Sequence, residues 1–559
     1  MAAQTDTVRQ FSSVNIAHYL PSLAARFPDK LAIIDSQVKD KSHPARQITF
    51  GELEQRTNRI ANGLVKAGIS RGARTMVMVR PSIDFIAISF ALFKIGAVPL
   101  LIDPGMGRKN FIHAVESVRP EAFIGIELAH VLRLLHRKSF RSVQTVITVG
   151  ARWFWGGSKL AKLEVEANDG FEMADTSSEE TAAILFTTGS TGPAKGVVYT
   201  HGIFDTQTQL IHKEWNIGEE DVDLPVFPLF ALFSTALGAK VIIPDMNPTR
   251  PAFADADKMV RIIEEHQVTY SFGSPAFWTR VSDFCVEKEK VLKSLHTVLM
   301  AGAPISPALV QRMSKIMEEN ADVGIPYGAT ESLPVSWISG RKVRAETGVK
   351  TVDGQGYCVG RPLTCNTVKI IQVIDEAIPE FAQANELPPT EVGEICVKGP
   401  VVTKAYFARD EATALAKMRD GDQVWHRMGD LGYFDEDGLL WFCGRKAHRV
   451  DTANNRLYSV CTEAIFNRHE QVKRSALVGV TEGETQKPVI VIECLSNKMT
   501  EAQQDTLRKE LLELGQTSHL SKSIDDILFH PSFPVDIRHN AKIFREKLAV
   551  WAQERTGQS

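Results

Sequence analysis

The chain has 559 residues, of which 44% are hydrophobic and 23% charged, so it can bury large cores and exceeds the usual length of one domain. Its net charge of -3 is close to balance, which argues against a nucleic-acid-binding surface and against a strong electrostatic membrane anchor. The seven cysteines are scattered with no C-x-x-C pair, so we expect reduced thiols in a cytoplasmic protein, without a zinc site or a disulfide framework.

The N-terminal region contains one long apolar run, residues 85–102, which has the length of a membrane span. Lys94, Gly96 and Pro99 interrupt this run, so we expect a buried helix that ends near Lys94, a turn, and a buried strand over 98–102. A helix over 51–67 and a strand over 75–79 precede it. This order is the βαβ rhythm of a wound α/β domain without a transmembrane segment.

Residues 187–196, TTGSTGPAKG, lie between the short apolar runs 182–186 and 197–199, which predicts a strand, a polar loop and a second strand. Glycines let the backbone approach a ligand, while the hydroxyls, the backbone amides and Lys195 suit phosphate oxygens. A loop of this composition can also be a simple turn. It is not a Walker A loop, because Ala194 and Gly196 stand where that motif needs glycine and Ser or Thr.

Four later motifs follow this loop in order: Gly302-Ala303-Pro304, IPYGATESL (325–333), WHRMGDLGYFDEDGLLWFCGR (425–445) and FPVDIRHNAKIFREKL (533–548). Together the five motifs resemble the adenylate-forming superfamily of acyl- and aryl-CoA synthetases, peptide-synthetase adenylation domains and firefly luciferase. The resemblance implies an α/β fold with a large N-terminal domain, 1–446, of wound α/β subdomains and a β-barrel-like part. A small mobile α+β domain, 447–559, would then carry the catalytic lysine.

The resemblance also implies how ATP and Mg²⁺ are bound. Tyr327 would stack on adenine, and Asp430 would accept hydrogen bonds from both ribose hydroxyls. Glu331 is a hard oxygen ligand suited to Mg²⁺, and Lys542 would bridge the attacking carboxylate and the α-phosphate. The residues expected to bind ATP are Thr187, Thr188, Gly189, Ser190, Thr191, Gly192, Lys195, Gly302, Ala303, Pro304, Tyr327, Gly328, Ala329, Asp430 and Arg445, with Thr330, Glu331 and Lys542 as the catalytic residues.

The acyl pocket of such enzymes corresponds here to LPVFPLFALFSTALG, residues 224–238. The resemblance places Ala231 where many acyl-CoA synthetases carry histidine, and it leaves Phe227, Phe230 and Phe233 as an apolar cluster. The cluster is either ordinary core packing or a pocket widened for a bulky lipid.

Four motif positions depart from the superfamily's usual residues: Met428 replaces threonine, Ala541 the glycine before Lys542, Ala447 a hinge Asp or Lys, and Asn454 a loop glycine. In CoA ligases that glycine-bearing loop helps to form the pantetheine tunnel, where a backbone passes close to the ligand. The departures at Ala447 and Asn454 indicate either neutral drift in a CoA ligase or a chain that forms no thioester.

The combination of PLFALFS, YGATESLPVSWISG, VDTANNRLYS and DIRHNAKI resembles the β-lactone synthetases of bacterial long-chain olefin biosynthesis. This implies an AMP-forming ligase that converts a long-chain 2-alkyl-3-hydroxy acid into its acyl-adenylate and closes a β-lactone through the 3-hydroxyl, in company with other olefin-biosynthesis enzymes. The alternatives are a long-chain fatty acyl-CoA ligase and a non-catalytic nucleotide-binding relative. The presence of Glu331, Asp430 and Lys542 argues against the non-catalytic nucleotide-binding relative. For the base that removes the hydroxyl proton, His201 is a candidate, beside a purely structural role.

Overall fold

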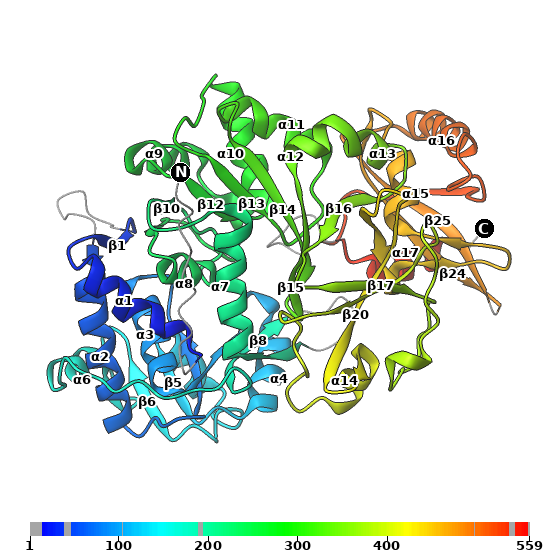
Figure 1. Ribbon diagram of the computed structural model, residues 1–559. Helices are drawn as coiled ribbons and strands as arrows, with labels where there is room; N and C mark the ends of the chain where they lie inside the picture. Colours follow the sequence, from blue (N-terminus) through cyan, green and yellow to red (C-terminus); the bar gives the residue numbers. More distant parts are fainter. Residues whose placement is uncertain are drawn as a thin grey trace, which may run out of the picture.

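The structure is a computed structural model that describes residues 14–37, 46–102, 104–187, 194–483, 485–496, 498–535 and 543–556. The chain begins with α1 (Tyr19–Arg26), β1 (Leu31–Asp35), β2 (Arg46–Thr49) and α2 (Phe50–Lys66). Figure 1 shows two sheet-based layers on the N-terminal side and a smaller unit, in orange and red, at the opposite end of the molecule.

The first layer is a seven-stranded sheet in the order β7-β6-β5-β3-β4-β8-β9. Its neighbours pair in parallel except β8 and β9, which form an antiparallel hairpin around the predicted phosphate loop. The pair confirms the two expected strands, and residues 188–193 between them lie outside the described residues. The elements of this layer are β3 (Arg74–Met78), α3 (Ile83–Ile95), β4 (Val98–Leu101), α4 (Arg108–Val118), β5 (Ala122–Gly125), α5 (Glu127–Leu135), β6 (Thr145–Thr148), β7 (Ser158–Lys159), α6 (Leu160–Val165), β8 (Thr181–Thr187) and β9 (Lys195–Thr200).

The long apolar run of the sequence forms α3 and β4, as expected. Gly96 ends the helix with a φ of 74°, a left-handed conformation that glycine adopts without a Cβ penalty. Lys94 is buried, and its Nζ donates to Glu54 Oε2 at 2.7 Å and to Asn58 Oδ1 at 2.6 Å. Within the described ranges, no helix is long and apolar enough to cross a bilayer.

The second layer is a fourteen-stranded sheet in the order β17-β18-β20-β21-β16-β15-β14-β13-β12-β10-β11-β1-β2, with β19 paired to β20. Strands β1 and β10 to β14 pair in parallel, whereas β15 to β21 pair antiparallel and stand where the resemblance implies a barrel-like part. The strands after β9 are β10 (Val222–Asp223), β11 (Lys240–Ile243), β12 (Tyr270–Gly273), β13 (Thr297–Met300), β14 (Asp322–Ala329), β15 (Ser332–Ser339), β16 (Tyr357–Pro362), β17 (Thr367–Ile371), β18 (Gly393–Lys398), β19 (Lys417–Asp420), β20 (Gln423–Phe434) and β21 (Leu440–Arg445).

The helices of this layer begin at residues that the sequence marks as helix starts. Ser274 and Ser306 cap α10 and α11 by accepting the backbone N–H of the third residue that follows, and a proline occupies the first turn of each. The helices are α7 (His201–Trp215), α8 (Phe230–Ala236), α9 (Ala256–His266), α10 (Pro275–Glu287), α11 (Pro307–Ile316), α12 (Gly340–Lys342), α13 (Gly348–Val352) and α14 (Asp410–Ala416).

The C-terminal part is a small α+β unit with its own apolar core, which includes Leu477, Ile490, Leu507 and Leu511. Strands β24 and β25 pair antiparallel, and β26 pairs with β25 in parallel. Its elements are β22 (Val450–Asp451), β23 (Arg456–Leu457), α15 (Ser459–Phe466), β24 (Val472–Glu482), β25 (Thr485–Cys494), α16 (Glu501–Gln516), β26 (Asp526–Phe529) and α17 (Arg545–Thr556). The boundary at 446/447 stays a prediction.

Candidate active site

A cavity of about 1810 Å³ extends between the two layers and the start of the C-terminal part. Most of its lining follows the carboxyl ends of parallel strands, the usual place for a ligand in a wound sheet. Strands β20 and β21 close one side of it. The predicted residues that line the cavity are Lys195, Gly302, Ala303, Pro304, Tyr327, Gly328, Ala329, Thr330, Glu331, Asp430 and Arg445.

Part of the predicted set lies outside the described residues. This holds for Thr188, Gly189, Ser190, Thr191 and Gly192 of the phosphate loop and for Lys542. Thr187 is the last residue of β8, immediately before that loop. The roles expected of these residues stay predictions.

Asp430 and Arg445 face each other in register on the neighbouring strands β20 and β21. Tyr327 Oη donates to Asp430 Oδ2 at 2.8 Å, and Arg445 Nη1 lies 2.8 Å from Asp430 Oδ1. The second contact is an ion pair. Burial raises the pKa of Asp430, and the guanidinium of Arg445 opposes this shift. The pair offers the acceptor and the cation expected for the ribose side of the nucleotide.

Glu331 lies in the turn between β14 and β15, and an aromatic hydroxyl holds its side chain. Tyr406 Oη donates to Glu331 Oε1 at 2.7 Å. The carbonyl of Glu331 accepts the backbone N–H of Thr403 at 2.9 Å and the Thr403 hydroxyl at 3.0 Å. Tyr199 Oη fixes the preceding residue by donating to the carbonyl of Thr330 at 2.6 Å. The turn is therefore held from two separate parts of the chain.

Three residues of this surrounding network were missing from the sequence expectations: Thr403, Tyr406 and Lys417. The ring of Tyr406 lies under Lys195, whose Nζ is 4.8 Å from the ring centroid. Lys417 is buried, donates to the hydroxyl of Thr403 at 3.3 Å and also to its carbonyl, and burial lowers its pKa to about 7. No spacing or composition in the sequence connects these residues with Glu331.

Glu331 fits a magnesium ion that arrives with the nucleotide. Within the ranges that the structure describes, no group of three or more His, Cys, Asp or Glu side chains could hold a metal ion. Mg²⁺ is commonly bound by one or two carboxylates together with substrate phosphates and water, so a single carboxylate in the cavity suffices for this kind of site.

Phe227, Phe230 and Phe233 line the apolar end of the cavity, and their expected role in an acyl pocket stays a prediction. Phe230 stacks on Phe272 with ring centroids 3.6 Å apart. Ala231 was expected here as well, but it does not line the cavity and is buried in the core. The two helical positions that line the cavity, 230 and 233, are three residues apart on α8, and Ala231 is turned about 100° from Phe230.

His201 does not line the cavity and is buried, which argues against it as the candidate base. It is the first residue of α7, fully buried, with its ring edge-on to Phe93 at 6.3 Å between centroids. Burial lowers its pKa to about 4, which keeps the imidazole neutral in the core.

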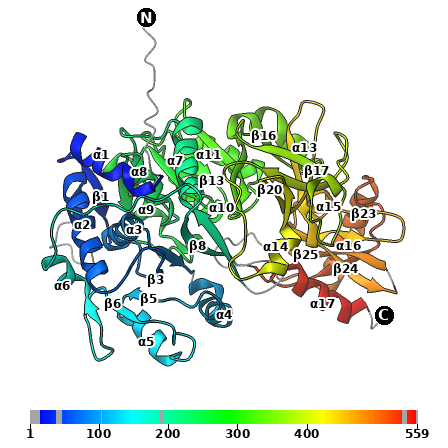
Figure 2. The same cartoon turned by 60° about the horizontal axis from the view of Figure 1, so that its bottom comes forward.

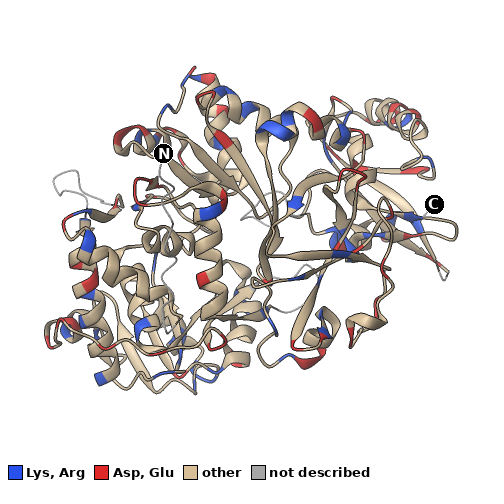
Figure 3. Ribbon diagram, viewed as in Figure 1, with Lys and Arg blue, Asp and Glu red and all other residues tan. Residues whose placement is uncertain are grey.

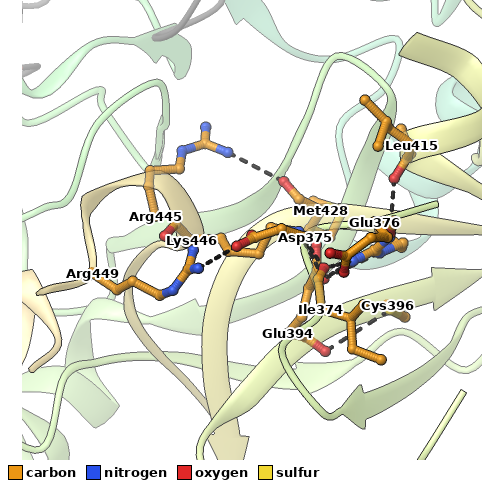
Figure 4. Close-up of polar contacts among 12 residues, drawn as sticks. Ile374, Asp375, Glu376, Glu394, Cys396, Leu415, Met428, Arg445, Lys446 and Arg449 are labelled. Atoms are coloured by element: carbon orange, nitrogen blue, oxygen red, sulfur yellow. Dashed lines mark hydrogen bonds and ion pairs between the residues drawn. The ribbon is translucent and has the colours of Figure 1, made fainter. Parts of the chain in front are cut away.

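A buried ion cluster fixes the chain where β21 ends (Figure 4). Arg427 Nη2 lies 2.7 Å from Glu394 Oε2, and both side chains are 1% exposed. Lys446 Nζ reaches the same oxygen at 3.2 Å, and Arg449 Nη2 lies 2.5 Å from Asp375 Oδ2. These contacts attach the first residues after Arg445 to the antiparallel half of the large sheet.

The two substituted positions of the expected hinge and loop lie close to this cluster in sequence. Ala447 lines the cavity, in the short 3₁₀ turn that follows β21. Asn454 is exposed in the turn between β22 and β23, where its N–H donates to the Thr452 hydroxyl at 3.4 Å.

Residues 21–407 match the family model of the AMP-binding enzymes. An olefin beta-lactone synthetase of Xanthomonas campestris pv. campestris is 44% identical over 558 residues, which cover 98% of this chain and 99% of the relative. Another, of Stenotrophomonas maltophilia, is 45% identical over 548 residues, or 96% of this chain and 98% of the relative. The solved structure of the amide bond synthetase McbA of Marinactinospora thermotolerans has a TM-score of 0.77 at 20% identity and covers 96% of this chain and 99% of that chain.

The likeness to the solved structure shows that the fold is the adenylate-forming one, as the sequence motifs implied. The matches to the two synthetases cover 98% and 96% of this chain. The chain therefore belongs to the AMP-binding enzymes and, within them, to the family of olefin β-lactone synthetases.

Proposed function

We propose that this protein converts a long-chain 2-alkyl-3-hydroxy acid into a β-lactone at the expense of ATP, with release of AMP and pyrophosphate. The observation that carries the proposal is the 44 to 45% identity to olefin beta-lactone synthetases over nearly the whole chain. The assembled nucleotide site, with Glu331, Asp430 and Arg445 on one cavity, supports it.

In the first half-reaction, an oxygen of the substrate carboxylate attacks the α-phosphorus and the bond to pyrophosphate breaks. Tyr327 and the Gly302-Ala303-Pro304 turn hold the adenine, while Asp430 and Arg445 hold the ribose. The Thr330 hydroxyl faces the α-phosphate. Lys195, the phosphate loop and Lys542 offset the charge of the polyphosphate as the two anions approach each other.

Glu331 is the residue that would hold Mg²⁺, in the orientation that Tyr406 and Thr403 impose on it. When bound, the ion neutralises phosphate charge and supports in-line displacement. The buried Lys417 donates a hydrogen bond to the hydroxyl of Thr403, which in turn holds the turn that carries Glu331.

In the second half-reaction, the 3-hydroxyl oxygen attacks the carbonyl carbon of the acyl-adenylate and the bond from that carbon to AMP breaks. The hydroxyl proton leaves to a base. Because nucleophile and electrophile belong to one molecule, correct orientation alone can supply an effective concentration of about 10⁵ to 10⁸ M. The aromatic lining formed by Phe227, Phe230 and Phe233 orients the chains and excludes the water that would hydrolyse the adenylate.

We also propose that the chain divides at residues 446/447 into a nucleotide- and acyl-binding domain and a mobile domain that brings Lys542 to the cavity. The ion cluster around Glu394 fixes the chain at this boundary. A cytoplasmic location and cooperation with other olefin-pathway enzymes belong to the same proposal. All seven cysteines are free thiols, which fits a reducing compartment.

Exchange of labelled pyrophosphate into ATP tests the first half-reaction. We expect exchange that depends on the hydroxy acid and that falls by at least about 10²-fold in Lys542→Ala, because the bridging cation is lost. Lys509→Ala, an exposed lysine on α16, is the control and should exchange like the wild type. Normal exchange in Lys542→Ala would contradict the proposed role of Lys542.

A further inference from the structure

The segment from Leu128 to Leu163 concentrates positive charge in a chain that is otherwise balanced. It contains seven basic and no acidic residues: Arg133, Arg137, Lys138, Arg141, Arg152, Lys159 and Lys162. Elsewhere both signs are interspersed over the elements, as Figure 3 shows for one face. The chain thus contains a local basic region although its net charge is only -3. The exposed cations of this region are Arg137, Lys138, Arg141 and Arg152.

The same segment exposes large apolar side chains. Leu128 and Leu135 on α5 are 68% and 75% exposed, and Trp153 and Phe154, in the loop after β6, are 58% and 80% exposed. Figure 2 shows α5 at the lower edge of the molecule. We call Leu128, Leu135, Trp153 and Phe154, with the four exposed cations named above, the α5 patch.

The loop that carries the two exposed aromatic residues is anchored to α5. Trp155 is buried and stacks on His130 of the helix, with ring centroids 5.0 Å apart and an interplanar angle of 10°. Glu127 Oε1 accepts the backbone N–H of Ala151 at 2.6 Å. The packing of Trp155 thus fixes the loop that exposes Trp153 and Phe154. The ring centroids of Trp153 and Trp155 are 5.2 Å apart.

The patch is continuous with the apolar end of the cavity. Leu128, Leu132 and Leu135 lie on one face of α5, at spacings of four and seven residues, and all three line the main cavity. Leu128 and Trp153 also line a second hollow of about 410 Å³ beside Arg80. An apolar chain that leaves the cavity along α5 would therefore emerge at the exposed residues of the patch.

Exposed aromatic and leucine side chains beside an excess of lysine and arginine match an anionic lipid surface. The two nearby carboxylates, Glu116 and Glu127, accept hydrogen bonds from the Ser139 hydroxyl and the Ala151 N–H. The aromatic and aliphatic groups enter the headgroup region and the cations contact lipid phosphates. We propose that the α5 patch docks this enzyme reversibly on an anionic lipid surface, from which, given the proposed function, the long-chain substrate enters the cavity along α5.

Co-sedimentation of the full-length protein with vesicles tests the proposal without any substrate. We expect binding to vesicles of phosphatidylcholine mixed with phosphatidylglycerol, weaker binding at high ionic strength, and little binding to phosphatidylcholine alone. Trp153→Ser combined with Phe154→Ser should weaken binding by more than about tenfold through loss of apolar burial. Arg137→Glu with Lys138→Glu should weaken it by at least about fivefold for each cation.

Matched controls alter equally exposed residues elsewhere. Phe253→Ser (Phe253 is 69% exposed) and Lys509→Glu should bind vesicles as the wild type does. All variants should keep wild-type pyrophosphate exchange with a water-soluble short-chain hydroxy acid, so that a failure of the proposed catalysis is distinguished from a failure of docking.

Equal vesicle binding by the patch variants and the wild type would overturn the proposal, as would absence of binding to anionic vesicles. Light scattering tests whether the patch instead binds a second copy of the chain. A wild-type dimer that the patch variants convert to a monomer, with no vesicle binding, would support that alternative and contradict lipid docking.

Discussion

Each of the two carboxylates proposed to serve the nucleotide and its Mg²⁺ is held by a buried tyrosine. Tyr327 donates to Asp430 at 2.8 Å and Tyr406 donates to Glu331 at 2.7 Å. Burial, together with the neighbouring carboxylate, raises the pKa of each tyrosine, so both hydroxyls keep their protons and act as donors. A hydrogen bond to a charged group contributes about 1.5 to 3 kcal/mol, enough to fix one carboxylate rotamer. The site is thus oriented before the nucleotide arrives.

Tyr406→Phe tests this orientation of Glu331. The variant removes the hydroxyl but keeps the ring under Lys195. We expect kcat/KM for ATP to fall about tenfold or more and the Mg²⁺ concentration for half-maximal rate to rise, because a charged hydrogen bond of at least about 1.5 kcal/mol is lost. Steady-state kinetics at varied Mg²⁺ measure both.

The control for this variant is Tyr433→Phe, since the Tyr433 hydroxyl donates to the carbonyl of Gln355 at 3.1 Å and the residue does not line the cavity. It should keep wild-type kinetics. Unchanged kinetics in Tyr406→Phe would show that Glu331 does not need the hydrogen bond from Tyr406.

At the scale of the elements, the strands β18, β20 and β21 meet in a buried cluster of charges. Glu394 accepts from Arg427 and Lys446, and Arg427 also donates to the backbone carbonyl of Glu376 at 2.7 Å. Buried charges are tolerated when they are paired and hydrogen-bonded, and loss of one partner leaves the others uncompensated. The cluster therefore stabilises the boundary between the sheet and the C-terminal unit.

Glu394→Ala should lower the free energy of unfolding by about 3 to 5 kcal/mol, because Arg427 stays buried without its carboxylate. Urea denaturation followed by circular dichroism provides the measurement. Glu386→Ala, which removes an exposed partner of Lys369, serves for comparison and should cost no more than about 1 kcal/mol. Equal stability of the two variants would refute the importance of the cluster.

Two buried histidines, His130 on α5 and His201 on α7, make stability depend on pH. The pKa of His130 and that of His201 fall to about 4 in the folded protein from an ordinary value of 6.5. The unfolded chain therefore binds more protons in this interval, and stability is lost as pH falls from 6.5 toward 4, by up to about 1.4 kcal/mol per pH unit for each histidine.

His201→Gln removes one of these groups, so its free energy of unfolding should decline less steeply with falling pH than that of the wild type. Urea titrations at several pH values between 7 and 5 give the two slopes. Identical slopes would mean that His201 does not titrate in this interval on unfolding.

At the scale of the whole molecule, the sequence predicted the parts of the site that local chain order determines. The β8–β9 strand pair and the α3–β4 pair each join residues close in the chain. Glycines, prolines and apolar periodicity mark such units directly.

Residues brought together by distant pairing were not predictable in the same way. Tyr406 reaches Glu331 across 75 residues, and Lys417 reaches the same turn through Thr403. A β-bridge between Ser332 and Val402 places these two segments side by side. No spacing in the sequence predicts this bridge. The position of Ala231 depended on the rotational phase of α8, which the apolar pattern of 224–238 left undetermined because that segment is apolar on all sides.

A single cavity is lined by Asp430, by Glu331 and by Phe230. The proposed nucleotide site and the aromatic end therefore share one continuous space. A substrate bound in it can present its own hydroxyl to its activated carbonyl without a second acceptor. The most direct measurement is therefore mass spectrometry of the products that the purified protein forms from Mg-ATP and a synthetic long-chain 2-alkyl-3-hydroxy acid, with and without CoA. The account predicts β-lactone and AMP in the absence of CoA, and a thioester that forms only with CoA, with no lactone in either reaction, would contradict it.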